Sequence, residues 1–212
     1  MSEARAEPVR VLTFIEVRSD SVARASALLR EYVDALEEGS QPLEAQLLHE
    51  VDRPRRFVLL ERAASPEVLR QGEERGEGRL QAAAALFTAP PDRRTHHPFA
   101  RSCGPGTPTA AERAGHEAIS VVAHLDIAGG ADRAGPEAAL ERLAREACRN
   151  SGNERFEVWQ QTNRSNHFDL VARWRSRREL DAFAASAAAR AFREAVGPWL
   201  GSPYDERLYR RE

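Results

Sequence analysis

The chain repeats itself at a spacing of 111 residues, and this repeat limits the folds that are open to it. The segment RFVLLERAASPEVLRQGEER, residues 56–75, recurs as HFDLVARWRSRRELDAFAAS, residues 167–186. Each copy opens with a strand-like run, turns at a serine and continues with a leucine at the start of a helical pattern. The sequence therefore predicts one structural unit that is built twice.

Both copies show the same order of elements, namely strand, helix, two strands, helix and strand. Short runs rich in apolar residues predict the strands, and apolar residues spaced three and four apart predict the helices. In the first copy the predicted strands are 9–18, 42–51, 55–63 and 93–102, and the helices are 22–36 and 66–87. In the second copy the strands are 118–127, 155–162, 167–174 and 204–210, and the helices are 140–147 and 180–195.

This order is that of the ferredoxin-like βαββαβ unit, in which both helices cover one face of an antiparallel sheet. The other face of each sheet needs cover, which a second copy supplies by packing sheet against sheet. The fold class is therefore α+β. We expect a first domain over 1–103, a linker rich in glycine and proline over 104–115, and a second domain over 116–212.

Composition excludes several classes of function. All 31 basic residues are arginine, a usage typical of GC-rich bacterial genomes, and the absence of lysine excludes Schiff-base and P-loop lysine chemistry. The net charge of -2 argues against nucleic acid as a partner, and no apolar run is long enough to span a membrane. We expect a cytoplasmic protein. Cys103 and Cys148 predict neither a disulfide framework nor a zinc site, and Cys148 is expected to be a small core residue.

Three sequence features together resemble a known family. The strand end RWRS at 173–176, the following ELDAF at 179–183 and the closing PYDERLY at 203–209 are similar to the antibiotic biosynthesis monooxygenase (ABM) family. The resemblance implies a dimeric α+β barrel, which this chain would form internally from its two repeats. It predicts a monomer with an internal pseudo-dimer, or a homodimer.

The resemblance also implies an activity. Members of the family oxidise polycyclic phenols or quinols with molecular oxygen, without metal or flavin, so we expect a small aromatic molecule as partner and no cofactor. The alternative is a non-catalytic barrel that binds a small hydrophobic ligand or serves as an assembly module. Haem breakdown is disfavoured, because Phe183 and Arg193 stand where the haem-degrading branch carries tryptophan and histidine.

Candidate site residues are polar or aromatic side chains on otherwise apolar strands. His124 interrupts an apolar strand and is a candidate general base, and Trp174 is a candidate aromatic wall; both are predicted to be catalytic. For each of these positions a purely structural role is the alternative reading. His96 and His97 are rejected as a metal pair, because adjacent strand residues point to opposite faces. The predicted substrate-binding residues are His49, Trp159, Gln160, Arg173 and Phe183.

The second helix differs between the two copies. In the first copy it contains Gly72, Gly76 and Gly78, each of which costs roughly 1 kcal/mol relative to alanine in a helix interior. The second copy has the alanine-rich AFAASAAAR at the same place. The sequence therefore predicts a weak, kinked or mobile helix in the first half and a firm, long one in the second, which makes the second half the better candidate for an active pocket.

Overall fold

The computed structural model describes residues 7–41, 43–100, 103–104, 117–128 and 133–212. The chain forms two compact units. Unit 1 comprises residues 1–97 together with 210–212, and unit 2 comprises residues 98–209. Most of the predicted linker lies outside the described residues, so the predicted domain boundaries stay a prediction.

Unit 1 contains a four-stranded antiparallel sheet in the order β4-β1-β3-β2. Successive side chains along each strand point alternately toward the helices and toward the other face. Both sets are largely buried, as in β3, where every residue after Arg56 is buried. The repeat therefore produces the predicted ferredoxin-like sheet in the first half. The strands are β1 (Val9–Glu16), β2 (Leu43–Glu50), β3 (Arg56–Ala63) and β4 (Asp92–Pro98).

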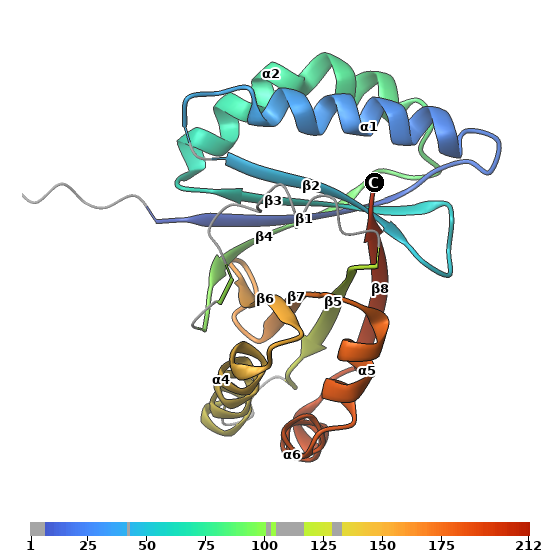
Figure 1. Cartoon of the computed structure of the whole chain (residues 1–212). Helices are drawn as coiled ribbons and strands as arrows, with labels where there is room; N and C mark the ends of the chain where they lie inside the picture. Colours follow the sequence, from blue (N-terminus) through green and yellow to red (C-terminus); the bar gives the residue numbers. More distant parts are fainter. Residues whose placement is uncertain (1–6, 42, 101–102, 105–116, 129–132) are drawn as a thin grey trace, which may run out of the picture. The chain divides into compact units, whose positions relative to one another are not determined.

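Two helices, α1 (Val22–Glu37) and α2 (Pro66–Ala84), lie side by side on one face of this sheet (Figure 1). The apolar side of α1 explains its position, because Leu29, Val33 and Leu36 are buried against the sheet in one core cluster. Ser65 fixes the start of α2, since its side chain accepts a hydrogen bond from the backbone N–H of Val68 at 3.2 Å.

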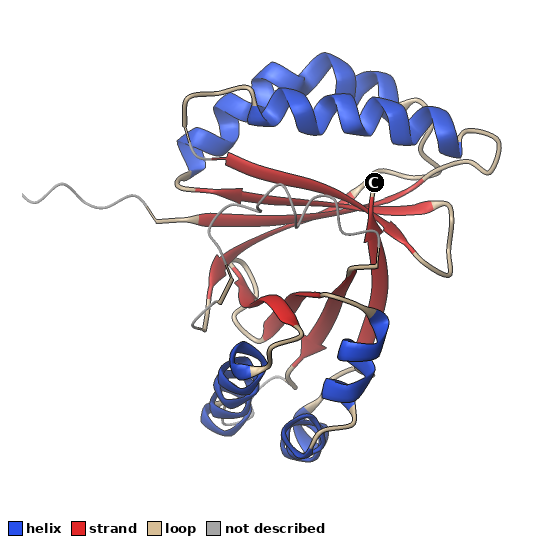
Figure 2. Cartoon of the chain, in the orientation of Figure 1, coloured by secondary structure: helices blue, strands red, loops and turns tan. Residues whose placement is uncertain are grey.

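Unit 2 repeats the arrangement with a sheet in the order β8-β5-β7-β6, again fully antiparallel. Helices cover one face of this sheet as well (Figure 2). The registers of the two sheets correspond, since Val9 lies opposite Ala63 on β3 and Ile119 lies opposite Trp174 on β7. The strands are β5 (Ile119–Asp126), β6 (Asn153–Gln161), β7 (His167–Trp174) and β8 (Asp205–Arg211).

The helices of unit 2 depart from the prediction. Besides α4 (Ala134–Arg149), the structure has α5 (Arg177–Ala184) and α6 (Ala187–Val196) instead of one long helix. Ser186 causes the break, because its backbone is extended and its side chain caps the N–H of Ala189 at 3.2 Å. The prediction of an unbroken second helix in this half is wrong. The short 3-10 turn η1 (Gly197–Trp199) follows α6.

The glycine-containing helix of unit 1, α2, is a continuous α-helix of 19 residues, so its glycines do not interrupt it. Its predicted mobility stays a prediction. A Cβ atom on Gly76 would lie 2.5 Å from the ring of Tyr32, and one on Gly72 would lie 2.3 Å from a methyl group of Leu43. These two glycines therefore allow α1 and the sheet to approach α2 closely, which compensates for their low helix propensity.

A disulfide bond joins Cys103 to Cys148 within unit 2, with their Cα atoms 5.6 Å apart. It ties the segment that follows Pro98 to the last turn of α4. The same segment pairs with β6, since the N–H of Cys103 donates to the carbonyl of Phe156 at 3.2 Å. The expectation that Cys148 is an unbonded core residue is therefore wrong, because spacing in the sequence does not show which cysteines meet.

The α+β class and the two ferredoxin-like repeats are confirmed by these two units. Across the part of the chain that the structure describes, every helix is too short or too polar to span a membrane.

Candidate active site

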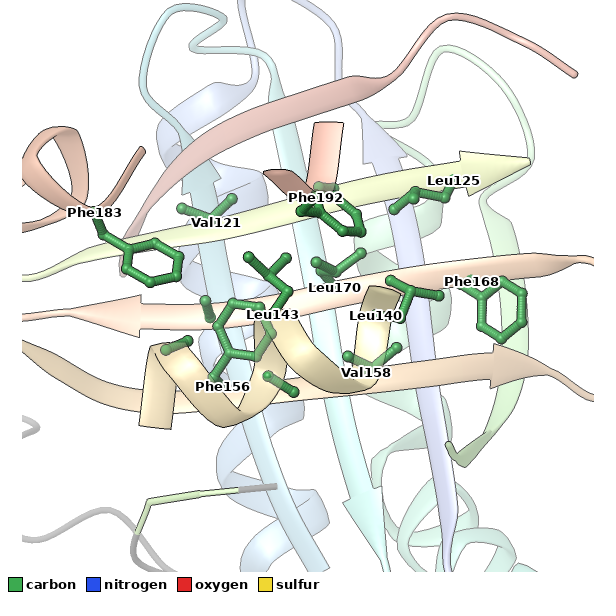
Figure 3. Close-up of a cluster of buried hydrophobic side chains, with 14 of the residues drawn as sticks. Val121, Leu125, Leu140, Leu143, Phe156, Val158, Phe168, Leu170, Phe183 and Phe192 are labelled. Atoms are coloured by element: carbon green, nitrogen blue, oxygen red, sulfur yellow. The ribbon is translucent and has the colours of Figure 1, made fainter. Parts of the chain in front are cut away.

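A cavity of about 60 Å³ lies between the sheet of unit 2 and the helices that cover it. Its walls come from β5, β6, β7, α4, α5 and α6, and its rim includes the chain around the start of β8. Figure 3 shows the buried cluster around it, in which side chains from the helices meet those of the strands. The lining residues are Val121, Ala123, Leu143, Phe156, Leu170, Ala172, Trp174, Leu180, Phe183, Ala184, Ala189, Phe192, Arg193, Tyr204 and Glu206.

Two of the predicted residues, Trp174 and Phe183, form an aromatic wall of this cavity. Their ring centroids lie 4.8 Å apart, and both side chains are buried. Trp174 ends β7, and Ser176 starts α5 two residues later by accepting a hydrogen bond from the N–H of Glu179 at 3.3 Å. This cap sets the phase of α5, so that Phe183 faces the sheet. The sequence pattern W-x-S-x-x-E thus positions the wall.

The rim of the cavity is polar. The hydroxyl of Tyr204 donates a hydrogen bond to the carboxylate of Glu206 at 3.0 Å, and Arg193 donates to the carbonyl of Ala184 at 3.0 Å. Burial raises the pKa of Tyr204 well above its usual value, and the nearby negative charge of Glu206 raises it further. Tyr204 therefore stays protonated at neutral pH, beside one carboxylate and one guanidinium at the mouth of an apolar cavity.

His124 belongs to a different cluster, on the opposite face of the same sheet. Its Nδ1 lies 3.1 Å from the carboxylate of Asp169, and its Nε2 lies 3.3 Å from Nδ1 of His167. The Nε2 of His167 in turn lies 3.3 Å from the carboxylate of Asp126. Four titratable side chains thus form one continuous chain of contacts, and the sequence indicated only one of them.

The structure does not bring the two predicted catalytic residues together. Trp174 belongs to the cluster under the helices, whereas His124 alternates with the helix-facing residues Ala123 and Leu125 and points the other way. A substrate in the cavity would contact Trp174 but not His124. The assignment of both residues as catalytic stays a prediction.

His49 and Gln160 occupy equivalent places, as predicted, and each reaches across the neighbouring hairpin turn. The Nε2 of His49 lies 2.8 Å from the carbonyl of Pro54, and the amide of Gln160 donates to the carbonyl of Ser165 at 2.6 Å. His49 also pairs with the carboxylate of Glu212 at 2.9 Å. These contacts place both side chains at hairpin ends, and Gln160 does not line the cavity of unit 2.

Trp159 and Arg173 lie on the face of the unit 2 sheet that carries His124. Trp159 is fully buried, and Arg173 donates to Glu154 at 2.8 Å. Neither side chain borders the cavity, and their predicted role in substrate binding stays a prediction. Among the described residues, no three histidine, cysteine, aspartate or glutamate side chains gather in a way that could hold a metal ion.

Comparison with known families finds a match over the part of the chain that carries this geometry. The family model "Antibiotic biosynthesis monooxygenase" (ABM) matches residues 118–195, which carry most of the cavity walls. Over these residues, the second half of the chain is similar to the ABM family. None of the curated proteins matches the sequence.

Solved structures resemble the whole chain and not only its ABM domain. A candidate monooxygenase from Lactobacillus acidophilus aligns with a TM-score of 0.77 at 8% identity, over 97% of this chain and 94% of that one. A candidate monooxygenase from Fusobacterium nucleatum aligns with a TM-score of 0.81 at 8% identity, over 97% and 93%. An anthrone oxidase-like protein aligns with a TM-score of 0.65 at 14% identity, over 100% and 94%. At these identities the likeness shows the shared fold across both halves.

The sequence indicated the aromatic wall of the ABM domain but missed its polar rim. Tyr204 and Glu206 lie in the segment PYDERLY that carries part of the family resemblance, but the local pattern did not show that either side chain borders a cavity. Glu206 faces the cavity because β8 pairs with β5, where it lies opposite Ala123. The pairing of strands that are far apart in sequence was the missing information.

Proposed function

We propose that the chain is a cofactor-independent monooxygenase of the ABM type, which oxidises a small aromatic phenol or quinol in the cavity of unit 2. The observation that carries this proposal is an aromatic-walled cavity within the ABM domain, with Tyr204, Glu206 and Arg193 at its rim. An apolar cavity with a few convergent polar groups is the usual form of a small-molecule site.

Each rim residue has a role in this proposal. Trp174 and Phe183 hold the flat ring of the substrate, and the phenolic hydroxyl faces the rim. The carboxylate of Glu206 accepts the phenolic proton, and the guanidinium of Arg193 stabilises the resulting phenolate. Tyr204 remains a neutral hydrogen-bond donor, because its pKa is raised. A phenolate gives up electrons to oxygen more readily than the neutral phenol does.

The reaction balances without an external reductant. A phenol with hydrogen on the para carbon reacts with one molecule of oxygen to give a quinone and one molecule of water. One oxygen atom enters the ring, and the other leaves as water with the phenolic hydrogen and the displaced ring hydrogen. Because the substrate itself supplies the electrons, the protein needs only to bind it, transfer a proton and stabilise the resulting charge.

The size of the cavity favours the second candidate function, a non-catalytic site for a small hydrophobic ligand. A cavity of about 150 Å³ is known to accommodate one benzene ring, whereas this one has about 60 Å³. An aromatic substrate therefore requires Phe183 or Phe192 to move outward. The break between α5 and α6 lies between these two side chains, so the helices can supply such a movement.

Oxygen uptake by purified, metal- and flavin-free protein tests the two candidates. The substrates are hydroxynaphthalenes, anthrones and quinols, and the variants are Trp174→Ala, Glu206→Gln and His124→Ala. We expect Trp174→Ala and Glu206→Gln each to lower kcat/KM by about 100-fold, the range for loss of positioning or of a general base. His124→Ala should leave uptake nearly unchanged, since His124 lies on the other face of the sheet. Gly78→Ala, in unit 1, is the control variant.

Uptake that depends on His124 and not on Trp174 would move the reaction to the opposite sheet face. Tight binding of a naphthol, measured by quenching of tryptophan fluorescence, without any uptake would favour the binding module instead.

A further inference from the structure

The cavity of unit 2 has an equivalent place in unit 1, and there the lining is different. Strand register makes Ala123 equivalent to Thr13 and Glu206 equivalent to Arg93, because each pair occupies the same position on matching strands. The 111-residue repeat adds three further positions. The cavity-lining residues Leu143, Ala172 and Ala184 correspond to Tyr32, Glu61 and Glu73.

Glu61 is the unusual member of this unit 1 set, which we call the Glu61 cluster: Thr13, Tyr32, Glu61, Glu73 and Arg93. Glu61 lies on β3 on the helix-facing side of the sheet and is only 1% exposed. Among the described residues, none donates a hydrogen bond to either of its carboxylate oxygens, and the buried hydroxyl of Thr13 likewise makes no hydrogen bond. A buried carboxylate without hydrogen bonds is costly and calls for a functional explanation.

The charges around Glu61 do not balance when its carboxylate is ionised. Arg93 lies 4.0 Å away through Nη1, but its Nη2 is in close contact with Glu73. One guanidinium thus serves two carboxylates. Among the described residues, Val11 on β1 and Ala45 on β2 lie directly opposite Glu61, and Arg93 and Glu73 are the charged groups that act on it. The Glu61 cluster is one positive charge short.

The chemistry of the cluster matches one kind of ligand. Burial raises the pKa of Glu61 to about 7, Arg93 opposes this, and Glu73 adds to it. A proton therefore supplies the missing charge over part of the physiological range. The Tyr32 ring and hydroxyl share this interior with the carboxylate, since the charge of Glu61 contributes to the raised pKa of Tyr32. A carboxylate beside an aromatic ring is the usual recognition of an ammonium group.

The cluster is accessible through its outer members. Arg93, which lies 4.0 Å from Glu61, and Glu73 are each about one-third exposed, so the cluster reaches solvent through these two flexible side chains. The ring of Tyr32 fills the space beneath Gly76, so a ligand head of more than a very few atoms would not fit.

We propose that the Glu61 cluster is a second small-molecule site, distinct from the unit 2 cavity, which binds a small primary amine as its ammonium ion. The ammonium group replaces the proton on Glu61 and donates hydrogen bonds to its carboxylate. This site does not depend on the proposed oxygenase function, because it lies in the other unit and uses other residues.

Proton linkage provides the test, with methylammonium chloride as the probe. Carbon-13 NMR of glutamate-labelled protein measures the midpoint of the pH titration of the Glu61 carboxyl. The Glu61 signal is the one that Glu61→Gln removes. A two-heavy-atom ligand at the limit of ligand efficiency has a Kd of about 5 mM, so about 100 mM lowers the midpoint by about one pH unit. Sodium chloride and tetramethylammonium chloride at equal concentration are the controls, since neither offers an N–H donor.

Each outcome of this titration either supports or overturns the ammonium site. A midpoint near pH 7 in sodium chloride that falls only in methylammonium chloride supports the site. An equal midpoint in all three salts overturns it, and so does an equal fall in methylammonium and tetramethylammonium chloride. A second readout covers the case in which Glu61→Gln is poorly folded: amide shifts of Thr13 and Tyr32 on addition of methylammonium should appear in the unaltered protein and in Trp174→Ala.

Discussion

At the scale of single residues, Glu61 makes the stability of the protein depend on pH. Its pKa is raised from 4.5 to about 7 in the folded state, so between these values the folded chain binds more protons than the unfolded one. Stability from this group is therefore fully present below about pH 4.5 and is lost as the pH rises through 7. The shift corresponds to about 3 kcal/mol in total.

We expect Glu61→Gln to remove this dependence. Urea unfolding of unit 1 at about pH 5 and pH 8 should show a fall in stability of roughly 2–3 kcal/mol for the unaltered protein and a much smaller one for the variant. Glu74, an exposed glutamate on α2, is the matched control, and Glu74→Gln should behave like the unaltered protein. Identical pH profiles for Glu61→Gln and the unaltered protein would contradict the buried, poorly compensated carboxylate.

At the scale of elements, α2 allows a paired test of what its glycines do. A Cβ at Gly76 would meet the ring of Tyr32 at 2.5 Å, whereas nothing lies within 4 Å of a Cβ at Gly78. Helix propensity favours alanine by about 1 kcal/mol at both positions. We therefore expect Gly78→Ala to stabilise by up to about 1 kcal/mol and Gly76→Ala to destabilise by about 1–3 kcal/mol, as overpacking does.

Thermal unfolding of the two variants measures this difference directly. Stabilisation by both substitutions would mean that Tyr32 yields without cost, and that Gly76 has no role in packing α1 against α2.

The same helix shows how far the sequence alone can go. Period and alternation located every strand and the first helix of each half, because those patterns report which face of an element is buried. Propensity failed for the second helices, where a glycine-rich α2 is continuous and the alanine-rich segment breaks at Ser186. Tertiary contacts at Gly76 and a side-chain cap at Ser186 decided these cases, and neither is visible in a propensity average.

The candidate site shows the same division. Trp174 and Phe183 could be predicted, because each follows directly from the local strand and helix pattern. Tyr204, Glu206 and the Glu61 cluster could not, since their importance depends on which strands pair and on what lies opposite them. His124 was correctly placed on the face away from the helices, but the sequence did not reveal its partners Asp169 and His167.

At the scale of the whole molecule, the disulfide between Cys103 and Cys148 constrains unit 2. It closes a loop with a sequence separation of 45, for which chain entropy gives a stabilisation of about 4 kcal/mol. We expect Cys148→Ser, or treatment with a reducing agent, to lower the urea midpoint of unit 2 strongly and that of unit 1 little. Tryptophan fluorescence follows unit 2, which holds all three tryptophans (Trp159, Trp174 and Trp199), and a probe placed in unit 1 follows the other transition.

The control is Cys103→Ser with Cys148→Ser, which should respond to a reductant no further. A urea midpoint of unit 2 that is the same with and without the reductant would show that the cross-link does not restrict the unfolded chain.

The disulfide also bears on where and how this protein can be studied. Structural disulfides persist in oxidising surroundings and are rare where glutathione keeps thiols reduced. The predicted cytoplasmic location implies reducing conditions, whereas this disulfide requires oxidising ones. Preparations made with and without dithiothreitol would contain the protein without and with this disulfide. The redox state of every sample therefore has to be known before activities are compared.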